Sequence, residues 1–152
     1  MAEPRSRGAE EGTASLELVI LAPMMFAVLS LILVFGRYAE AEGNIDQAAR
    51  DSARAATAQN SQSTAEQLAV EVATEAVADA PDSCQSSLDI DFETGPHAYE
   101  LPDLDDATAV SWVSVHVECT VDLTDLGPLP LKETTIAKTF TSPLDRYRGV
   151  AD

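Results

Sequence analysis

Basic residues are missing from the middle of this 152-residue chain. No Lys or Arg occurs between Arg54 and Lys132, whereas fifteen Asp and Glu fall in that interval, and the formal net charge is -17. A surface of this sign repels the phosphate backbone of nucleic acids. We therefore expect an acidic, well-solvated surface and no nucleic-acid binding.

Motifs that indicate catalysis or cofactor binding are also missing. The chain has no glycine-rich phosphate loop and no nucleophile elbow. His97 and His116 lie nineteen positions apart, without a Cys or Glu at metal-ligand spacing. The acidic runs are Asp89, Asp91 and Glu93, and Asp103, Asp105 and Asp106. Neither run has the spacing of a calcium loop, so we expect solvated side chains, no metal, no cofactor and no enzymatic activity.

Cysteine is scarce, because Cys84 and Cys119 are the only two in the chain. In a small exported module, such a pair is more often a disulfide than two free thiols. A bridge would close a loop of about 36 residues and stabilise the fold by about 3–4 kcal/mol. We expect this disulfide, with two unpaired structural cysteines as the alternative.

One long apolar run is present near the N-terminus. The eighteen residues of Leu18–Phe35 carry no charge, and thirteen of the twenty in Leu16–Phe35 are Leu, Ile, Val or Phe. A helix rises about 1.5 Å per residue, so this stretch just crosses a hydrocarbon core of about 30 Å. We predict a leader over residues 1–12 and a transmembrane helix over residues 13–36.

Pro23 stands inside the predicted span. Proline removes one backbone hydrogen bond and predicts a helix kink, which membrane helices tolerate when neighbouring groups satisfy the freed carbonyl.

Helical composition continues after the span, over residues 37–80, with a break near residues 60–63. Ser63 and Glu66 have the form of a capping box that begins the second helix. Small or apolar residues at helical spacing predict a stripe that lets another helix approach closely: Ile45, Ala49 and Ser52. The second helix is expected to end before Pro81 and to bury Leu68, Val72 and Ala76.

From Leu88 the apolar period changes to two, which predicts half-buried strands. The strands are expected within Leu88–Glu93, Val113–Leu123 and Thr134–Thr141. A turn at Gly127–Pro130 would pair the last two strands antiparallel, and a tail would begin at Pro143. The predicted fold is α+β: a long N-terminal transmembrane helix that continues into a soluble helix, then, over residues 81–152, a small antiparallel β-sheet with a packed helix.

The start of the apolar run carries a more specific pattern. Gly12 precedes Thr13, and Glu17 stands at the fifth position of the segment that begins at Thr13. This arrangement resembles the processing site of type IV prepilin-like proteins.

A family resemblance follows from the same region. The run LELVILAP at residues 16–23 and the tripeptide FGR at residues 35–37 resemble the TadE-like group of the tight-adherence (Flp-type) pilus machinery. The resemblance covers about residues 7–55. Major fibre subunits of this class are usually much shorter, so a chain with an added domain resembles a minor subunit.

The resemblance implies roles for individual residues. A prepilin peptidase would cleave after Gly12 and expose Thr13 as the new N-terminus. Glu17 would pair with the terminal amine of a neighbouring subunit. A carboxylate near the centre of a bilayer costs about 2.5 kcal/mol or more, so one at its boundary favours a cationic partner. The alternative for Glu17 is a first-turn acid that faces the headgroups and complements the helix dipole.

The predicted function is that of a non-enzymatic, membrane-anchored pseudopilin or minor pilin in the assembly of a Tad/Flp-type pilus or a related secretion apparatus. Its expected partners are a prepilin peptidase, other Tad/Flp pilins or pseudopilins, and the membrane. Arg37, Arg50 and Arg54 follow the span and weaken the orientation signal from charge, but Arg5 and Arg7 before it still favour a cytoplasmic N-terminus in a bacterial cell membrane. The two cysteines and the acidic C-terminal part agree with an extracytoplasmic C-terminal domain.

Two other interpretations of the apolar run stay open. A bitopic anchor that presents a sensor or ligand-binding domain needs neither Gly12 nor Glu17. A secretory signal cleaved near Ala41 would release a soluble domain, although the uncharged run of eighteen residues exceeds the usual length of about 7–15.

Overall fold

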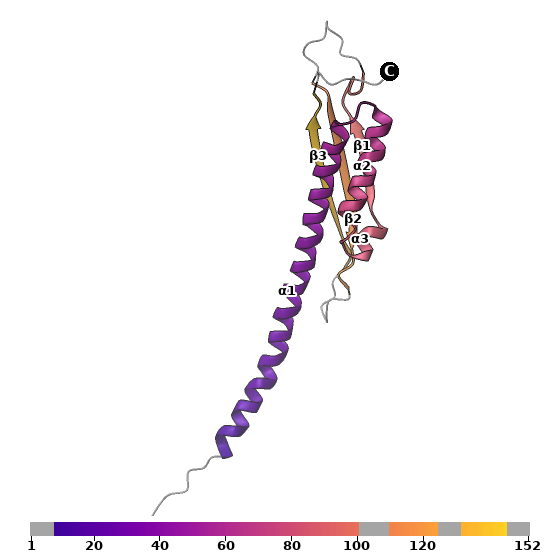
Figure 1. The fold of residues 1–152 in the computed structure, drawn as a ribbon. Helices are drawn as coiled ribbons and strands as arrows, with labels where there is room; N and C mark the ends of the chain where they lie inside the picture. Colours follow the sequence, from indigo (N-terminus) through magenta and orange to yellow (C-terminus); the bar gives the residue numbers. More distant parts are fainter. Residues whose placement is uncertain (1–7, 101–109, 125–131, 146–152) are drawn as a thin grey trace, which may run out of the picture.

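The computed structural model describes residues 8–100, 110–124 and 132–145, with side chains from Glu17 onward (Figure 1). The elements follow in the order α1 (Gly8–Thr57), α2 (Gln62–Ala76), α3 (Asp82–Ser86), β1 (Asp89–Thr94), β2 (Trp112–Val121) and β3 (Thr134–Pro143). This arrangement confirms the predicted α+β fold. We call α2, α3 and the three-stranded sheet the head.

Helix α1 is one continuous rod of 50 residues. The predicted membrane span and the first part of the soluble extension belong to this single helix. Its N-terminal half stands clear of the other elements, and its C-terminal half runs along the head (Figure 1). Pro23 lies inside the helix, which continues on both sides of it.

Helix α2 begins two residues earlier than a Ser63 cap requires. Its N-cap is Ser61, which has an extended backbone and whose hydroxyl accepts a hydrogen bond from the Thr64 N–H at 3.3 Å. The predicted capping box of Ser63 and Glu66 is therefore wrong. Serine is a favoured N-cap wherever it precedes a helix, and here the extended backbone at Ser61 decides between the two serines.

The buried face of α2 also differs from the prediction. Its fully buried residues are alanines, whereas the predicted set of Leu68, Val72 and Ala76 is only half-buried. The buried alanines are Ala65, Ala69 and Ala73. The predicted stripe on α1 is buried at Ile45, Ala49 and Ser52. Because α1 packs on α2 with small residues, small side chains suit the line of closest approach and larger ones flank it.

The sheet has the order β1-β2-β3, and both pairs are antiparallel. The three predicted strands are thus confirmed, with ends that differ by one or two residues. Cross-strand partners include Ile90 with Val117 and Cys119 with Ile136. Alternate residues of β2 from Val113 to Val121 are fully buried and pack toward α1.

Two predictions concern the ends of β3. The turn predicted at Gly127–Pro130 lies outside the described residues. Pro143 ends β3 rather than beginning a tail, and Leu144 is buried, with its N–H donating to the Ser111 carbonyl at 2.9 Å.

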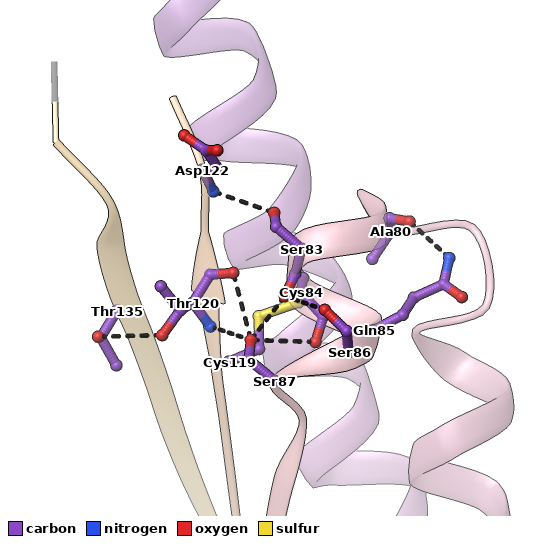
Figure 2. The surroundings of a disulfide bond; sticks show 10 residues. All are labelled: Ala80, Ser83, Cys84, Gln85, Ser86, Ser87, Cys119, Thr120, Asp122 and Thr135. Carbon is purple, nitrogen blue, oxygen red and sulfur yellow. Dashed lines mark hydrogen bonds between the residues drawn. A yellow bond between two sulfur atoms is a disulfide. The ribbon is translucent and has the colours of Figure 1, made fainter. Parts of the chain in front are cut away.

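Helix α3 attaches the segment before the sheet to β2. Cys84 and Cys119 form the expected disulfide, and both are fully buried (Figure 2). The Thr120 N–H donates to the Ser87 hydroxyl at 2.8 Å, and the Asp122 N–H donates to the Ser83 hydroxyl at 3.0 Å. The short helix was not predicted, because five residues carry no usable periodicity.

Candidate functional site

The candidate functional site is the N-terminal half of α1. Its large apolar side chains are exposed, from Leu18 at 68% to Phe35 at 63%. Val34 is the one buried residue in this run. A soluble surface rarely leaves so continuous an apolar area in water. By length and composition, this is the one helix in the described part of the chain that fits a single-pass membrane anchor.

Glu17 lies at the N-terminal edge of this apolar surface. Its side chain is exposed and borders a shallow groove along α1 with Leu21, Met25 and Leu29. These residues follow one another at helical spacing, so they share one face with the carboxylate. Among the residues with described side chains, none forms a hydrogen bond or ion pair with Glu17. The carboxylate therefore faces outward from the helix, beside an apolar face.

The predicted processing site lies in the first turns of α1. The backbone of Gly12 and Thr13 is helical, and the Thr13 side chain is outside the described part of the chain. Cleavage after Gly12 and the kink at Pro23 both stay predictions.

The C-terminal half of α1 is attached to the head by buried and polar contacts. Ala41, Ile45 and Ala53 are fully buried. Phe140 on β3 has two guanidinium groups over its ring, those of Arg50 and Arg54, each 5.9 Å from the ring centroid. The anchor and the head are thus joined by a packed helix rather than by a linker.

One ion pair links α1 to β3. The Lys138 Nζ donates to the Glu42 Oε1 at 2.6 Å. The hydrogen bond to this carboxylate and its negative charge raise the pKa of Lys138. Directly after the C-terminal end of β2, the hydrogen bonds from Thr124 to the Asp122 carboxylate lower the pKa of Asp122.

The histidines do not meet in a reactive site. His116 lies on the outer face of β2, with its Nδ1 2.7 Å from the Thr139 Oγ1 and its Nε2 3.7 Å from the nearest Glu118 carboxylate oxygen. His97, at the other end of the sheet, has its Nδ1 2.6 Å from the Glu100 Oε2. Among the described residues, no group of three or more His, Cys, Asp and Glu side chains could hold a metal ion.

The structure describes one of the two acidic runs. Asp89, Asp91 and Glu93 are exposed on β1, where Asp91 pairs with His116 across the sheet. The run of Asp103, Asp105 and Asp106 lies outside the described residues.

A polar cleft of about 320 Å³ lies beside the turn between α1 and α2. Its lining includes Ser61, Gln62, Gly95 and Tyr99. The Tyr99 hydroxyl donates to the Ala56 carbonyl at 3.0 Å. Sequence reasoning missed this cleft, because its residues come from segments that only the tertiary fold brings together.

Comparison with known proteins locates the family signal in α1. Residues 12–54 match a family model described as TadE-like protein. No curated protein and no solved structure gives a significant match to the chain. The matched segment begins at Gly12, contains Glu17 and Pro23, and ends three residues before α1 does. The chain is therefore TadE-like in its N-terminal helix, which confirms the resemblance seen in its sequence.

Proposed function

We propose that this protein is a membrane-anchored pseudopilin or minor pilin that acts in the assembly of a Tad/Flp-type pilus or a related secretion apparatus. The observation that carries the proposal is the coincidence of two features in α1. The TadE-like segment covers residues 12–54, and the exposed apolar run lies inside it. The anchor and the TadE-like signal are thus one helix.

Processing after Gly12 would create the cation that Glu17 needs. Cleavage exposes the α-amine of Thr13, and α-amines have a pKa of about 7.7–8.0, so much of the amine is charged at neutral pH. In a bundle of parallel helices, the amine of one subunit would pair with the Glu17 carboxylate of its neighbour. Removal of either partner would leave an unpaired charge beside hydrocarbon. The pair would therefore favour one axial register between adjacent helices.

The proposed orientation places the leader in the cytoplasm and the head outside it. Arg5 and Arg7 precede the span, but Arg37, Arg50 and Arg54 follow it within about twenty residues and weaken this charge signal. The disulfide between Cys84 and Cys119 supports the same orientation, because disulfides persist in oxidising compartments.

N-terminal sequencing and intact mass of the protein purified from its native membranes test this function. We expect a mature chain that begins at Thr13. A chain that begins at Glu42 would indicate a secreted domain released by signal peptidase. A chain that retains its first residues would indicate an unprocessed anchor and would contradict the pseudopilin assignment.

A matched pair of leader variants adds a control. We expect Gly12→Leu to abolish cleavage and to leave a product longer by the leader. Gly8→Leu, four positions upstream, should be cleaved like the wild type. Equal processing of the two variants would show that Gly12 is not the recognised residue.

A further inference from the structure

One face of the membrane helix is already covered by the head before the apolar run ends. Val34 is 8% exposed and belongs to the buried core, whereas Leu33 and Phe35 on either side of it are 61% and 63% exposed. The head therefore reaches down to the last turn of the apolar segment.

The contacts between α1 and β3 show how far the head extends along α1, independently of the burial of Val34. Glu42 meets Lys138, and Phe140, further along β3, lies beside Arg50 and Arg54, further along α1. The helix and the strand thus run in the same direction, as Figure 1 also shows.

From this direction, the start of β3 can be placed along the helix. Thr134 begins β3 four residues before Lys138, a distance of about 13 Å at about 3.3 Å per residue. The same distance along α1, at about 1.5 Å per residue, covers about nine residues and leads from Glu42 to the neighbourhood of Val34. The adjoining ends of β2 and β3 therefore lie beside the end of the apolar run.

We propose that this end of the head rests on the phospholipid headgroup layer. Its lipid-facing residues are Arg37 on α1, Thr124 after β2 and Lys132 before β3, which we call the membrane-facing end. All three are exposed. The inference rests on the proposed function, because it takes Leu18–Phe35 to lie in the bilayer.

The membrane-facing end carries the cations Arg37 and Lys132, with the acids Asp122 and Glu133 close to Thr124 and Lys132 in the chain. Lys132 is the first cation after Arg54 in a chain with a net charge of -17, and it lies at this end together with Arg37. Long cationic side chains near a membrane boundary extend toward the lipid headgroups. The acidic strand β1 has its carboxylates on the outer face of the sheet, away from α1.

Fluorescence quenching in vesicles of phosphatidylcholine and phosphatidylglycerol tests the proposal. The full chain is labelled with an environment-sensitive nitrobenzoxadiazole dye at an introduced cysteine, and the native cysteines stay in their disulfide. Lys132→Cys reports on the membrane-facing end. Ala58→Cys is the matched control, because Ala58 is exposed and lies just after α1, at the opposite end of the head. At about 1.5 Å per residue, Ala58 is about 36 Å from Val34 along the direction of α1. The quencher is a lipid with a nitroxide on its choline headgroup.

We expect headgroup nitroxide to cause a large loss of emission from the label at position 132 and almost none at position 58. Equal quenching at the two positions would overturn the proposal, because the head would then lie along the membrane. The absence of quenching at both positions would overturn it as well, because the head would then stand away from the membrane.

A third label separates this inference from the proposed function. Leu29→Cys places the dye within the apolar run, and we expect quenching by a lipid with nitroxide deep in its acyl chain. Loss of that quenching would overturn both the membrane anchor and the inference. Quenching at position 29 without quenching at position 132 would overturn the inference alone.

Discussion

The Lys138 ammonium lies 2.6 Å from the Glu42 carboxylate, although 96 positions separate them in the sequence. The contact joins the last strand to the first helix, seven residues past the end of the apolar run. Both side chains are partly exposed, so the pair acts more on the placement of β3 along α1 than on total stability.

The first prediction concerns the pH dependence of this ion pair. The Glu42 carboxylate raises the pKa of Lys138 above its ordinary value of 10.5. Because the folded pKa is higher than the unfolded one, the stabilisation is complete below the unfolded pKa and is lost as pH rises through the folded pKa. Lys138→Met should therefore lower the Tm at neutral pH, and the difference from the wild type should vanish at a pH above the raised pKa.

Thermal unfolding of the full chain in detergent, followed by circular dichroism, measures this difference. Lys132→Met is the control, because it removes an exposed lysine from the same end of the chain. Its difference in Tm from the wild type should not vanish as pH rises through the raised pKa of Lys138. A Lys138→Met difference that stays constant through the titration of lysine would contradict the role assigned to Glu42.

The second prediction concerns the disulfide. The bridge spans a sequence separation of 35 and fixes α3 to the central strand. Loss of a cross-link of this loop length should destabilise the folded state by about 3–4 kcal/mol. Replacement of both Cys84 and Cys119 by Ala should lower the urea midpoint of the full chain in detergent, and addition of a reductant should shift only the wild type. An unchanged urea midpoint of the wild type on addition of the reductant would contradict a stabilising disulfide.

The third prediction uses two glycines with opposite surroundings. A Cβ at Gly95 would lie 2.7 Å from the Trp112 Nε1, whereas a Cβ at Gly43 would meet nothing within 4 Å. Gly95→Ala should therefore displace the indole and destabilise the fold by about 1–3 kcal/mol. Gly43→Ala should stabilise α1 by up to about 1 kcal/mol through helix propensity.

Trp112 is the only tryptophan in the chain, so its emission reports the first change directly. Gly95→Ala should shift the emission spectrum and lower the urea midpoint together. Gly43→Ala should raise the midpoint and leave the spectrum unchanged. An unaltered spectrum in Gly95→Ala would show that the indole does not occupy the space next to Gly95.

The fourth prediction tests Glu17. Glu17→Ala should leave membrane insertion and processing largely intact and reduce assembly with partner pilins. Loss of about 1.4 kcal/mol from each contact between subunits would weaken that contact about tenfold. Glu40→Ala is the control, because Glu40 is an exposed acid on the same helix beyond the apolar run. Membrane fractionation measures insertion, and pilus yield measures assembly; a wild-type yield in Glu17→Ala would refute the pairing role.

Local periodicity was enough to predict most elements of this fold. The uncharged run Leu18–Phe35 and the alternation along β2 are patterns of near neighbours, which depend on helix and strand geometry alone. The face of α2 that is buried was mispredicted, because both Leu68 and Ala69 fit a helical period. The close approach of α1 decides between them, and it makes Ala69 the buried residue.

The sequence by itself determined the apolar helix, the three strands, the candidate processing pattern at Gly12 and the TadE-like resemblance, because each resides in residues close together in the chain. Only the tertiary structure decided how far the head descends along the helix. That level depends on contacts between distant segments, such as Glu42 with Lys138, and on the burial of Val34 among exposed neighbours. A pattern of local hydropathy contains no information about such distances, since they arise when the sheet packs on α1.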